Sequence, residues 1–250
     1  MDDYILEARG LSRDFAGFRA VSDVDIRVRR GQIHALIGPN GAGKTTMFNL
    51  LTKFLQPSAG TIVYNGKDIT RTKASVVARM GMVRSFQISA VFPHLTVLDN
   101  LRVALQRKLG TSFHFWKSDS SLDRLNTRAE ELIVAVGLGA FTHCVAADLS
   151  YGRRRALEIA TTLSLEPEML LLDEPMSGLG REDISTVSDL IREVGRKYTV
   201  LMVEHNLSVV AALSQTITVL ARGQVLAEGS YAEVSANPDV RAAYMGTTYA

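Results

Sequence analysis

The residues with the clearest chemical role form one loop, 38–45, with the sequence Gly-Pro-Asn-Gly-Ala-Gly-Lys-Thr. This is the phosphate-binding pattern G-x-x-x-x-G-K-T, in which glycines let the backbone wrap around phosphate and successive N–H groups point inward. Lys44 is expected to reach the β- and γ-phosphates of a nucleotide, and Thr45 to ligate Mg²⁺. The alternative is a glycine-rich turn that only caps a helix. The residues expected to bind the nucleotide here are Gly38, Pro39, Asn40, Gly41, Ala42, Gly43, Lys44, Thr45 and Thr46.

A second candidate site is the acidic pair Asp173-Glu174, which follows the apolar run 169–172. A buried strand of this kind delivers Asp173 to the C-terminal edge of a parallel sheet, where open α/β folds bind ligands. There Asp173 could hold Mg²⁺ directly or through water. In an extended chain Glu174 faces the opposite way and could polarise an attacking water, a role that contributes about 10²–10⁴ in rate. Two surface acids at a strand end are the alternative.

The flanks of the loop favour phosphate binding. Residues 33–37 are a short apolar run that predicts a buried strand. After the loop, Met47, Leu50, Leu51 and Phe54 recur at the i, i+3, i+4, i+7 spacing of an amphipathic helix. This strand–loop–helix arrangement is the structural context that the motif requires.

The rest of the chain alternates between strand and helix patterns. Apolar and polar residues alternate over 23–29, which predicts antiparallel strands near the N-terminus, and Asn65-Gly66 predicts a hairpin turn. A strand over 82–86 ends at Gln87. Helical patterns then dominate 88–166. They predict three apolar helix faces: one around Val97, Leu101 and Leu105, one around Ala129 and Ile133 that stops near Gly137, and one that follows the N-cap Ser150 and runs through Leu157 and Leu163. Strand–helix alternation resumes afterwards and includes a hairpin signal at Arg222-Gly223. The predicted architecture is an α/β core formed by 1–87 and 167–250, with an antiparallel β subdomain in the core and an inserted helical subdomain over 88–166.

Composition sets limits on the class of protein. The chain has 250 residues, of which 46% are hydrophobic, and a net charge of +2, so no global basic field points to nucleic acid. Its one cysteine, Cys144, excludes an intrachain disulfide. The N-terminus lacks the basic and apolar regions of a signal peptide, and the longest apolar runs are too short to span a bilayer. We therefore expect a soluble cytoplasmic protein whose membrane role, if any, comes through partners.

Further motifs give the chain a family resemblance. Residues 149–153, Leu-Ser-Tyr-Gly-Arg, resemble the signature sequence of ABC transporter ATPases, and Gln87 resembles their Q-loop glutamine. Residues 177–180 sit at the D-loop position, His205 matches the switch histidine, and Phe15 falls where the family stacks an aromatic ring on adenine. The resemblance covers essentially the whole chain, as a single ABC ATP-binding domain over 1–250. It implies a P-loop ABC ATPase core with a mixed, mainly parallel sheet, an antiparallel β subdomain and an inserted α-helical subdomain.

Within that family, the chain resembles the ATP-binding subunits of branched-chain amino-acid importers. The features concerned are Leu-Ser-Tyr-Gly at 149–152 and the sequences of 92–100, 203–207 and 240–246. The resemblance implies ATP hydrolysis that powers import. The transported solute never touches this subunit, so urea, amides and aromatic acids stay open beside branched-chain amino acids.

The resemblance also implies partners. The family works as a head-to-tail dimer, homomeric or heteromeric, in which each ATP lies between one subunit's phosphate loop and the other's signature helix. Ser150 and Gly152 of that helix would meet the γ-phosphate. Two integral-membrane permease subunits and, indirectly, a substrate-binding protein complete the expected assembly. This places the chain peripherally on the cytoplasmic face of the inner or plasma membrane, with no nucleic-acid partner.

The resemblance assigns catalytic roles to three side chains. Glu174 would act as the general base, and His205 would hydrogen-bond the γ-phosphate and orient the attacking water. Gln87 would contact Mg²⁺ or that water and sense the position of the helical subdomain. The implied cofactors are ATP and Mg²⁺, with Thr45, Gln87 and Asp173 as the metal-binding residues.

Two departures from the family pattern leave alternatives open. Arg153 and Arg154 replace the usual glutamines, and a positive charge at a helix N-terminus opposes the dipole by about 0.3–1 kcal/mol. These arginines could lie beside phosphate or form a solvated basic edge. Gly180 replaces the Asp or Asn of relatives and removes a side chain expected to reach the partner's site.

These departures support a second hypothesis, a degenerate regulatory subunit that pairs with a more active one. A third is a non-transport ABC switch, although such relatives usually carry two cassettes or long coiled-coil inserts. The stretch 113–117, Phe-His-Phe-Trp-Lys, could pack against a permease or fold onto the helical subdomain as a satellite cluster.

Overall fold

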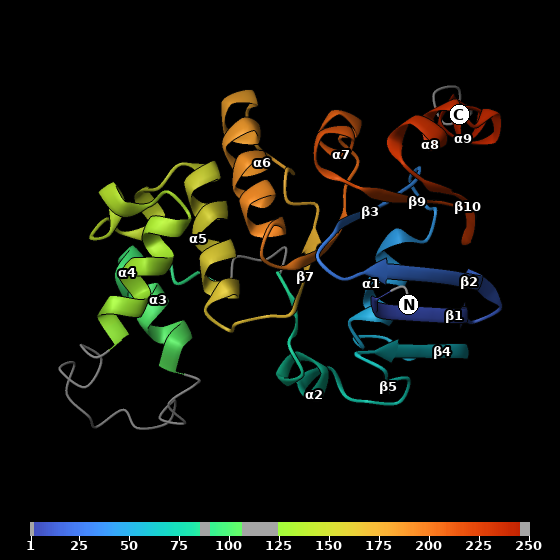
Figure 1. The fold of residues 1–250 in the computed structure, drawn as a ribbon, viewed down its shortest axis with the longest axis horizontal. Helices are drawn as coiled ribbons and strands as arrows, with labels where there is room; N and C mark the ends of the chain where they lie inside the picture. The colour runs from blue at the N-terminus through green and yellow to red at the C-terminus, as the bar shows by residue number, and fades with distance from the viewer. Residues whose placement is uncertain (1–2, 86–90, 107–124, 246–250) are drawn as a thin grey trace. The chain divides into compact units, whose positions relative to one another are not determined.

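The computed structural model describes residues 3–85, 91–106 and 125–245 (Figure 1). The chain divides into two compact units. The first, called the core unit below, comprises Met1–Arg84, Glu168–Pro175 and Ile191–Ala250. The second, called the helical unit, comprises Ser85–Pro167 and Met176–Leu190. The subdomain boundaries drawn from the sequence stay a prediction.

A six-stranded sheet in the core unit positions the site. Its strand order is β10-β9-β3-β8-β7-β6, with parallel pairing throughout except for the β9–β10 hairpin. Every residue of β3, β7 and β8 is buried, which explains their mainly apolar sequences and confirms the predicted parallel core. The strands are β3 Ile33–Ile37, β6 Met82–Arg84, β7 Met169–Asp173, β8 Thr199–Val203, β9 Thr216–Ala221 and β10 Gln224–Gly229.

The register brings the ends of three strands together. Val203, the last residue of β8, pairs with Leu36 of β3 on one side and with Asp173 of β7 on the other. The residues that follow these strands therefore emerge at one edge of the sheet. This is the edge at which parallel α/β sheets bind ligands.

A second sheet is antiparallel, with the order β2-β1-β4-β5. Val24, Ile26 and Val28 are buried and alternate with exposed residues, as predicted. The predicted Asn65-Gly66 turn is also confirmed, because both residues have positive φ (49° and 71°) between paired strands. The strands are β1 Tyr4–Phe15, β2 Phe18–Arg29, β4 Ala59–Tyr64 and β5 Lys67–Asp68.

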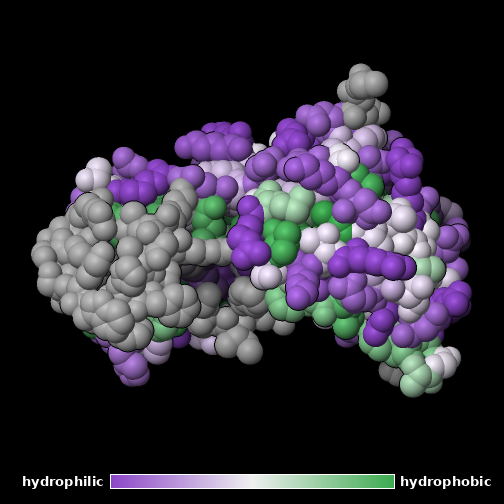
Figure 2. All heavy atoms as spheres, turned by 90° about the horizontal axis from the view of Figure 1, so that it is seen from below, coloured by the Kyte–Doolittle hydropathy of each residue, from purple (hydrophilic) through white to green (hydrophobic). Residues whose placement is uncertain are grey.

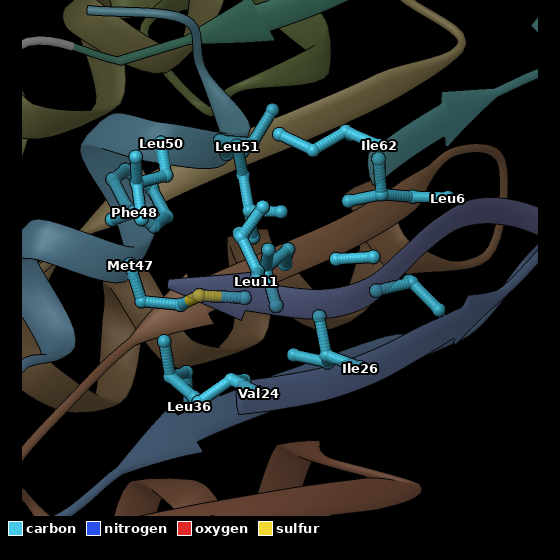
Figure 3. Packing of buried hydrophobic residues seen from close by; sticks show 14 of the residues in the cluster. Leu6, Leu11, Val24, Ile26, Leu36, Met47, Phe48, Leu50, Leu51 and Ile62 are labelled. Carbon is cyan, nitrogen blue, oxygen red and sulfur yellow. The ribbon is translucent and has the colours of Figure 1, made fainter. Parts of the chain in front are cut away.

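Helix α1, Lys44–Leu51, follows the glycine-rich loop and shares one hydrophobic core with both sheets. Figure 3 shows its Met47, Phe48, Leu50 and Leu51 among residues of β1, β2, β3 and β4. The prediction that Phe54 continues the buried stripe is wrong. The helix ends at Leu51, residue 53 turns the chain with a φ of 64°, and the side chain of Phe54 is 53% exposed.

Three longer helices lie in the helical unit, and their predicted apolar faces are confirmed: α3 Val97–Gln106, α4 Asn126–Ala135 and α5 Tyr151–Leu163. Thr96 caps α3, since its hydroxyl accepts the Asp99 N–H at 3.1 Å and donates to the Asp99 carboxylate at 2.6 Å. The predicted stop of α4 is confirmed at Gly137, whose φ is 76°.

The remaining helices are shorter, apart from α6, Arg181–Gly195, which begins in the helical unit and ends in the core unit. One of them, α2, was not anticipated from the sequence. This helix spans Ala74–Arg79, and the others are α7 Leu207–Leu213, α8 Tyr231–Ala236 and α9 Pro238–Met245. Among the described residues, none of the helices has the length and apolarity needed to cross a membrane. On the face drawn in Figure 2, hydrophilic side chains surround small hydrophobic patches.

His34 is a buried polar residue in the middle of β3. Its side chain is 1% exposed, and Nε2 lies 2.8 Å from the hydroxyl of Thr218 on β9. That hydroxyl donates to the Glu228 carboxylate at 2.6 Å, so the imidazole Nε2 is the donor to Thr218. Burial lowers the pKa of His34 from 6.5 to about 4, which keeps the ring neutral in the folded protein.

We expect this imidazole to make stability fall as the pH falls. Between pH 6.5 and 4 the unfolded chain binds a proton that the folded chain does not, whereas above pH 6.5 neither form binds it. The unfolding free energy of wild type should therefore decrease between pH 7 and pH 5 by about 2 kcal/mol more than that of His34→Gln. Urea titrations at the two pH values measure this difference. Exposed His94 supplies the control, His94→Gln. Parallel pH profiles for wild type and His34→Gln would contradict the prediction.

Candidate nucleotide-binding and catalytic site

The glycine-rich loop starts where β3 leaves the sheet, and packing requires glycine at two of its positions. A Cβ on Gly38 would lie 2.1 Å from the carbonyl oxygen of Leu220 on β9. A Cβ on Gly43, which has a φ of 97°, would lie 2.7 Å from the carbonyl oxygen of Ala20 on β2. Both distances are well inside van der Waals contact, so these glycines let the loop approach neighbouring backbone.

The turn between β9 and β10 holds the loop in place, a role that the sequence did not reveal. Gly223 donates its N–H to the carbonyl of Ala42 at 3.0 Å, and its own carbonyl accepts the Ser22 N–H at 2.8 Å. Gly223 has a φ of 77°, and a Cβ there would lie 2.6 Å from the Ala20 carbonyl oxygen. The Arg222-Gly223 hairpin signal predicted the turn but not its contact with the phosphate loop.

The C-terminal helix α9 also approaches the loop. Burial raises the pKa of the Tyr244 hydroxyl to about 12, although a backbone hydrogen bond with Gly38 works in the opposite direction. A cavity of about 630 Å³ lies between the loop and α9. It is lined in part by Pro39, Asn40, Gly41, Ala42, Ala242 and Ala243.

Lys44 directs its charge into the loop. Its ammonium donates to the carbonyls of Gly38 at 2.6 Å and of Pro39 at 3.0 Å. Burial lowers the pKa of Lys44, and the negative charge of Glu174 opposes that shift. Phosphate oxygens accept stronger, charge-assisted hydrogen bonds than carbonyls do, so a bound nucleotide can take over this ammonium.

Asp173 is held by a buried ion pair with Arg84, the last residue of β6. The carboxylate is 3% exposed, and the Arg84 guanidinium donates to its Oδ2 at 2.5 Å. The same guanidinium donates to Asn49 of α1 at 2.6 Å and stacks on the ring of Phe48, 4.9 Å from the ring centre. Among the described residues, none donates to the Asp173 Oδ1, which leaves that oxygen for a metal ion. Sequence reasoning missed Arg84; a lone arginine ending an apolar strand was its only signal.

Glu174 does not continue the strand. Its φ of 46° is left-handed, so the expectation that it faces away from Asp173 in an extended chain is wrong. Its N–H donates to the carbonyl of Val203 at 2.9 Å, which turns the chain across the end of β8. The half-buried carboxylate acts electrostatically on Lys44, so it lies toward the phosphate loop.

His205 follows β8 at the same sheet edge, and its side chain is exposed. The residue before it, Glu204, is fully buried. One carboxylate oxygen of Glu204 accepts the backbone N–H groups of His205 and Asn206, each at 2.9 Å. Sequence reasoning treated Glu204 only as part of a motif and did not predict its burial.

The proposed metal-binding residues suit Mg²⁺. Thr45 is exposed, and its hydroxyl makes no hydrogen bond with the described residues. Asp173 has a carboxylate oxygen to offer, while Gln87 lies outside the described residues. The described part of the chain contains no preformed cluster of three or more His, Cys, Asp or Glu. A site with so few protein ligands, here Thr45 and Asp173, fits Mg²⁺, because this ion keeps several waters and binds one or two protein groups together with substrate phosphates.

Phe15 ends β1 and pairs across the hairpin with Phe18. The hairpin continues into Ala20, which touches Gly43 of the loop, so the aromatic ring belongs to the same end of the core unit. The guanidinium of Arg13 lies over the Phe15 ring, 4.7 Å from its centre, and the side chain is 37% exposed. This position is compatible with stacking on an adenine.

The signature residues lie in the helical unit. Ser150 caps α5, as predicted, because its hydroxyl accepts the Arg153 N–H at 3.3 Å. Gly152 serves packing inside this unit, since a Cβ there would lie 2.3 Å from the Asp183 carboxylate at the start of α6. Gly180 supplies its carbonyl to the first turn of α6, accepting the Ile184 N–H at 2.9 Å.

Arg153 and Arg154, which depart from the family pattern, both contact other residues of the helical unit. Arg153 stacks on Phe141, 4.0 Å from the ring centre. Arg154 donates to the carbonyls of Ala147 at 3.0 Å and Leu149 at 3.2 Å. Arg153 stays exposed, whereas Arg154 is half-buried. The aromatic stretch 113–117 lies outside the described residues.

Comparison with known proteins identifies the family. A family model described as ABC transporter matches residues 21–177, well over half of the chain. The chain belongs to the ABC transporter family. A second model, described as branched-chain amino acid ATP-binding cassette transporter, matches residues 224–250 of this ABC ATPase. The predicted family and the ATPase class are thereby confirmed.

Two curated relatives match this ABC ATPase over nearly their full length. BraF of Pseudomonas aeruginosa, a high-affinity branched-chain amino acid transport ATP-binding protein, is 38% identical and aligns with 97% of this chain and 98% of its own. LivG of Salmonella typhimurium, which carries the same description, is 38% identical and aligns with 98% of this chain and 99% of its own.

Solved structures confirm the predicted fold class. The ADP conformation of MJ1267, an ATP-binding cassette of an ABC transporter, superposes with a TM-score of 0.86 at 28% identity, covering 97% of this chain and 99% of that one. A nucleotide-free ATP-binding cassette from an ABC transporter gives 0.83 at 26% identity, covering 96% and 98%. Both ATP-binding cassettes therefore span essentially the whole of this chain.

Proposed function

We propose that this chain is the ATP-hydrolysing subunit of an importer for branched-chain amino acids or similar small polar solutes. The observation that carries the proposal is the 38% identity to BraF and LivG over essentially the whole length of each chain. The match of residues 224–250 to the branched-chain amino acid cassette model adds independent support at the C-terminus.

The core unit supplies the residues for hydrolysis. The loop amides and Lys44 bind the β- and γ-phosphates of ATP, and Glu174 takes a proton from the attacking water as it approaches the γ-phosphate. His205 hydrogen-bonds the γ-phosphate and orients that water. Thr45, Asp173 and Gln87 would hold Mg²⁺, which neutralises charge on the phosphate oxygens. Phe15 stacks on the adenine.

The helical unit supplies the other half of the site. Ser150 is a helix N-cap, so its hydroxyl and the amides that follow it can meet the γ-phosphate bound to a second ATPase subunit. Closure of such a dimer on ATP and its release after hydrolysis would drive two permease subunits. A substrate-binding protein would feed those subunits, and this chain would lie peripherally on the cytoplasmic face of the membrane.

Purification of the chain with the membrane proteins that accompany it tests the proposal. We expect slow hydrolysis by the isolated chain at low concentration, rising with dimer formation, and faster hydrolysis by the complex. The complex in proteoliposomes should import leucine or valine when its binding protein is present. Import of urea instead would overturn the solute assignment alone, whereas a complex that transports without hydrolysis by this chain would favour the regulatory-subunit alternative.

A further inference from the structure

Glu204 is an ionisable side chain with no solvent exposure, placed between the end of β8 and the start of α7. A carboxylate is expensive to bury unless hydrogen bonds replace its hydration. Here one oxygen, Oε2, accepts two consecutive backbone N–H groups, from His205 and Asn206, each at 2.9 Å. Hydrogen bonds to an ionised acceptor are about twice as strong as neutral ones, so this carboxylate is a firm anchor for those two amides.

The segment that carries His205 depends on this anchor. On its N-terminal side, Val203 is fixed in the sheet between Leu36 and Asp173. On its C-terminal side, Asn206 caps α7 by accepting the Val209 N–H at 3.3 Å. Between these fixed points, the imidazole of His205 makes no hydrogen bond with the described residues. The backbone therefore sets where this exposed ring stands, and Glu204 holds that backbone.

We propose that Glu204 is a positioning residue, whose buried carboxylate holds the amides of His205 and Asn206 and thereby places the His205 imidazole for the γ-phosphate. The inference rests on the role of His205 in the proposed function. In this proposal the effect of Glu204 on catalysis passes through the backbone amides of His205 and Asn206, which its carboxylate accepts.

We expect Glu204 to affect the rate of ATP hydrolysis without affecting nucleotide binding. The phosphate loop is supported by other contacts, through Leu220, Ala20 and Gly223. Weakening the Glu204 anchor should leave those contacts intact, so ATP should bind as before. A displaced imidazole would lower the rate of the chemical step, because a small misplacement of a catalytic group costs up to about 10²-fold.

The test compares Glu204→Gln, which keeps the shape but removes the charge, with His205→Ala and the double variant. We expect Glu204→Gln to lower kcat at least about tenfold with KM for ATP within about twofold of wild type. The double variant should be no slower than His205→Ala, because residues that act through one another are not additive. Glu228→Gln, which alters a core-unit carboxylate that accepts the Thr218 hydroxyl, is the matched control and should keep wild-type kcat.

Hydrogen exchange supplies a second readout. The amides of His205 and Asn206 should exchange faster in Glu204→Gln, and also in Glu204→Asp, whose side chain keeps the charge but is one methylene shorter and so moves the carboxylate away from its position in the wild type. If Glu204→Gln is too unstable to assay, the same kcat loss and faster exchange are expected in Glu204→Asp. Unchanged kcat, or equal losses in the wild-type and His205→Ala backgrounds, would overturn the inference. A fully active His205→Ala would instead overturn the role of His205 in the proposed function.

Discussion

Glu174→Gln is expected to abolish ATP turnover while leaving ATP binding intact. The substitution keeps the shape of the side chain but removes the base that takes the proton from water, a loss of about 10²–10⁴ in rate. Lys44 and the loop amides are unchanged, so nucleotide affinity should stay close to that of wild type. Phosphate release measured beside nucleotide affinity separates the two effects.

The same variant should accumulate as an ATP-bound dimer, because closure needs the γ-phosphate and opening needs its removal. Size-exclusion chromatography with light scattering, with and without Mg·ATP, measures this. Glu182→Gln, on the exposed first turn of α6, is the matched control and should hydrolyse ATP like wild type. Full hydrolysis by Glu174→Gln would remove this residue from the general-base role.

Arg84→Met is expected to destabilise the protein by about 3–5 kcal/mol, because it leaves the Asp173 carboxylate buried without its partner. The two side chains are 14% and 3% exposed, so little solvent can replace the guanidinium. The double variant Arg84→Met/Asp173→Leu should recover most of that stability, since apolar side chains of similar volume replace a buried ion pair at little cost. It should nevertheless stay inactive, because Asp173 is also a proposed metal-binding residue.

Urea titrations of the unfolding free energy, run in parallel with ATPase assays, measure both consequences. The surface pair of Arg196 with Glu193, whose side chains are 68% and 60% exposed, supplies the comparison. Arg196→Met should cost less than about 1 kcal/mol, since exposed ion pairs contribute little. A similarly small loss for Arg84→Met would mean that water or another cation compensates Asp173.

Local patterns predicted much of the fold because they are determined within a few residues. The alternation over 23–29 needs only a strand with one buried face, and the Asn65-Gly66 turn needs only two residues that tolerate positive φ. The Ser150 cap needs only a hydroxyl within reach of the first free amides of α5. In each case the interaction partner lies within a few residues along the chain or on the adjoining strand.

The two local expectations that were wrong share a cause. Lys53 turns the chain just after α1 and Glu174 turns it after β7, both with positive φ (64° and 46°). Neither lysine nor glutamate signals a left-handed conformation, which tertiary packing imposes against their preference. The apolar spacing therefore predicts a helix through Phe54 although α1 ends at Leu51, and an extended Glu174 although the chain turns there.

The order of the motifs, the nature of the phosphate loop and, through them, the family follow from residue types alone. These features depend on residue types at fixed spacings along the chain. Only the tertiary structure revealed how Asp173 and His205 are held. Arg84 reaches Asp173 because β6 and β7 are neighbours in the sheet although 89 residues separate the two side chains in the chain. Glu204 is fully buried directly after β8, whose residues are all buried, and strand order, unlike motif order, is set by packing between segments that are distant in the sequence.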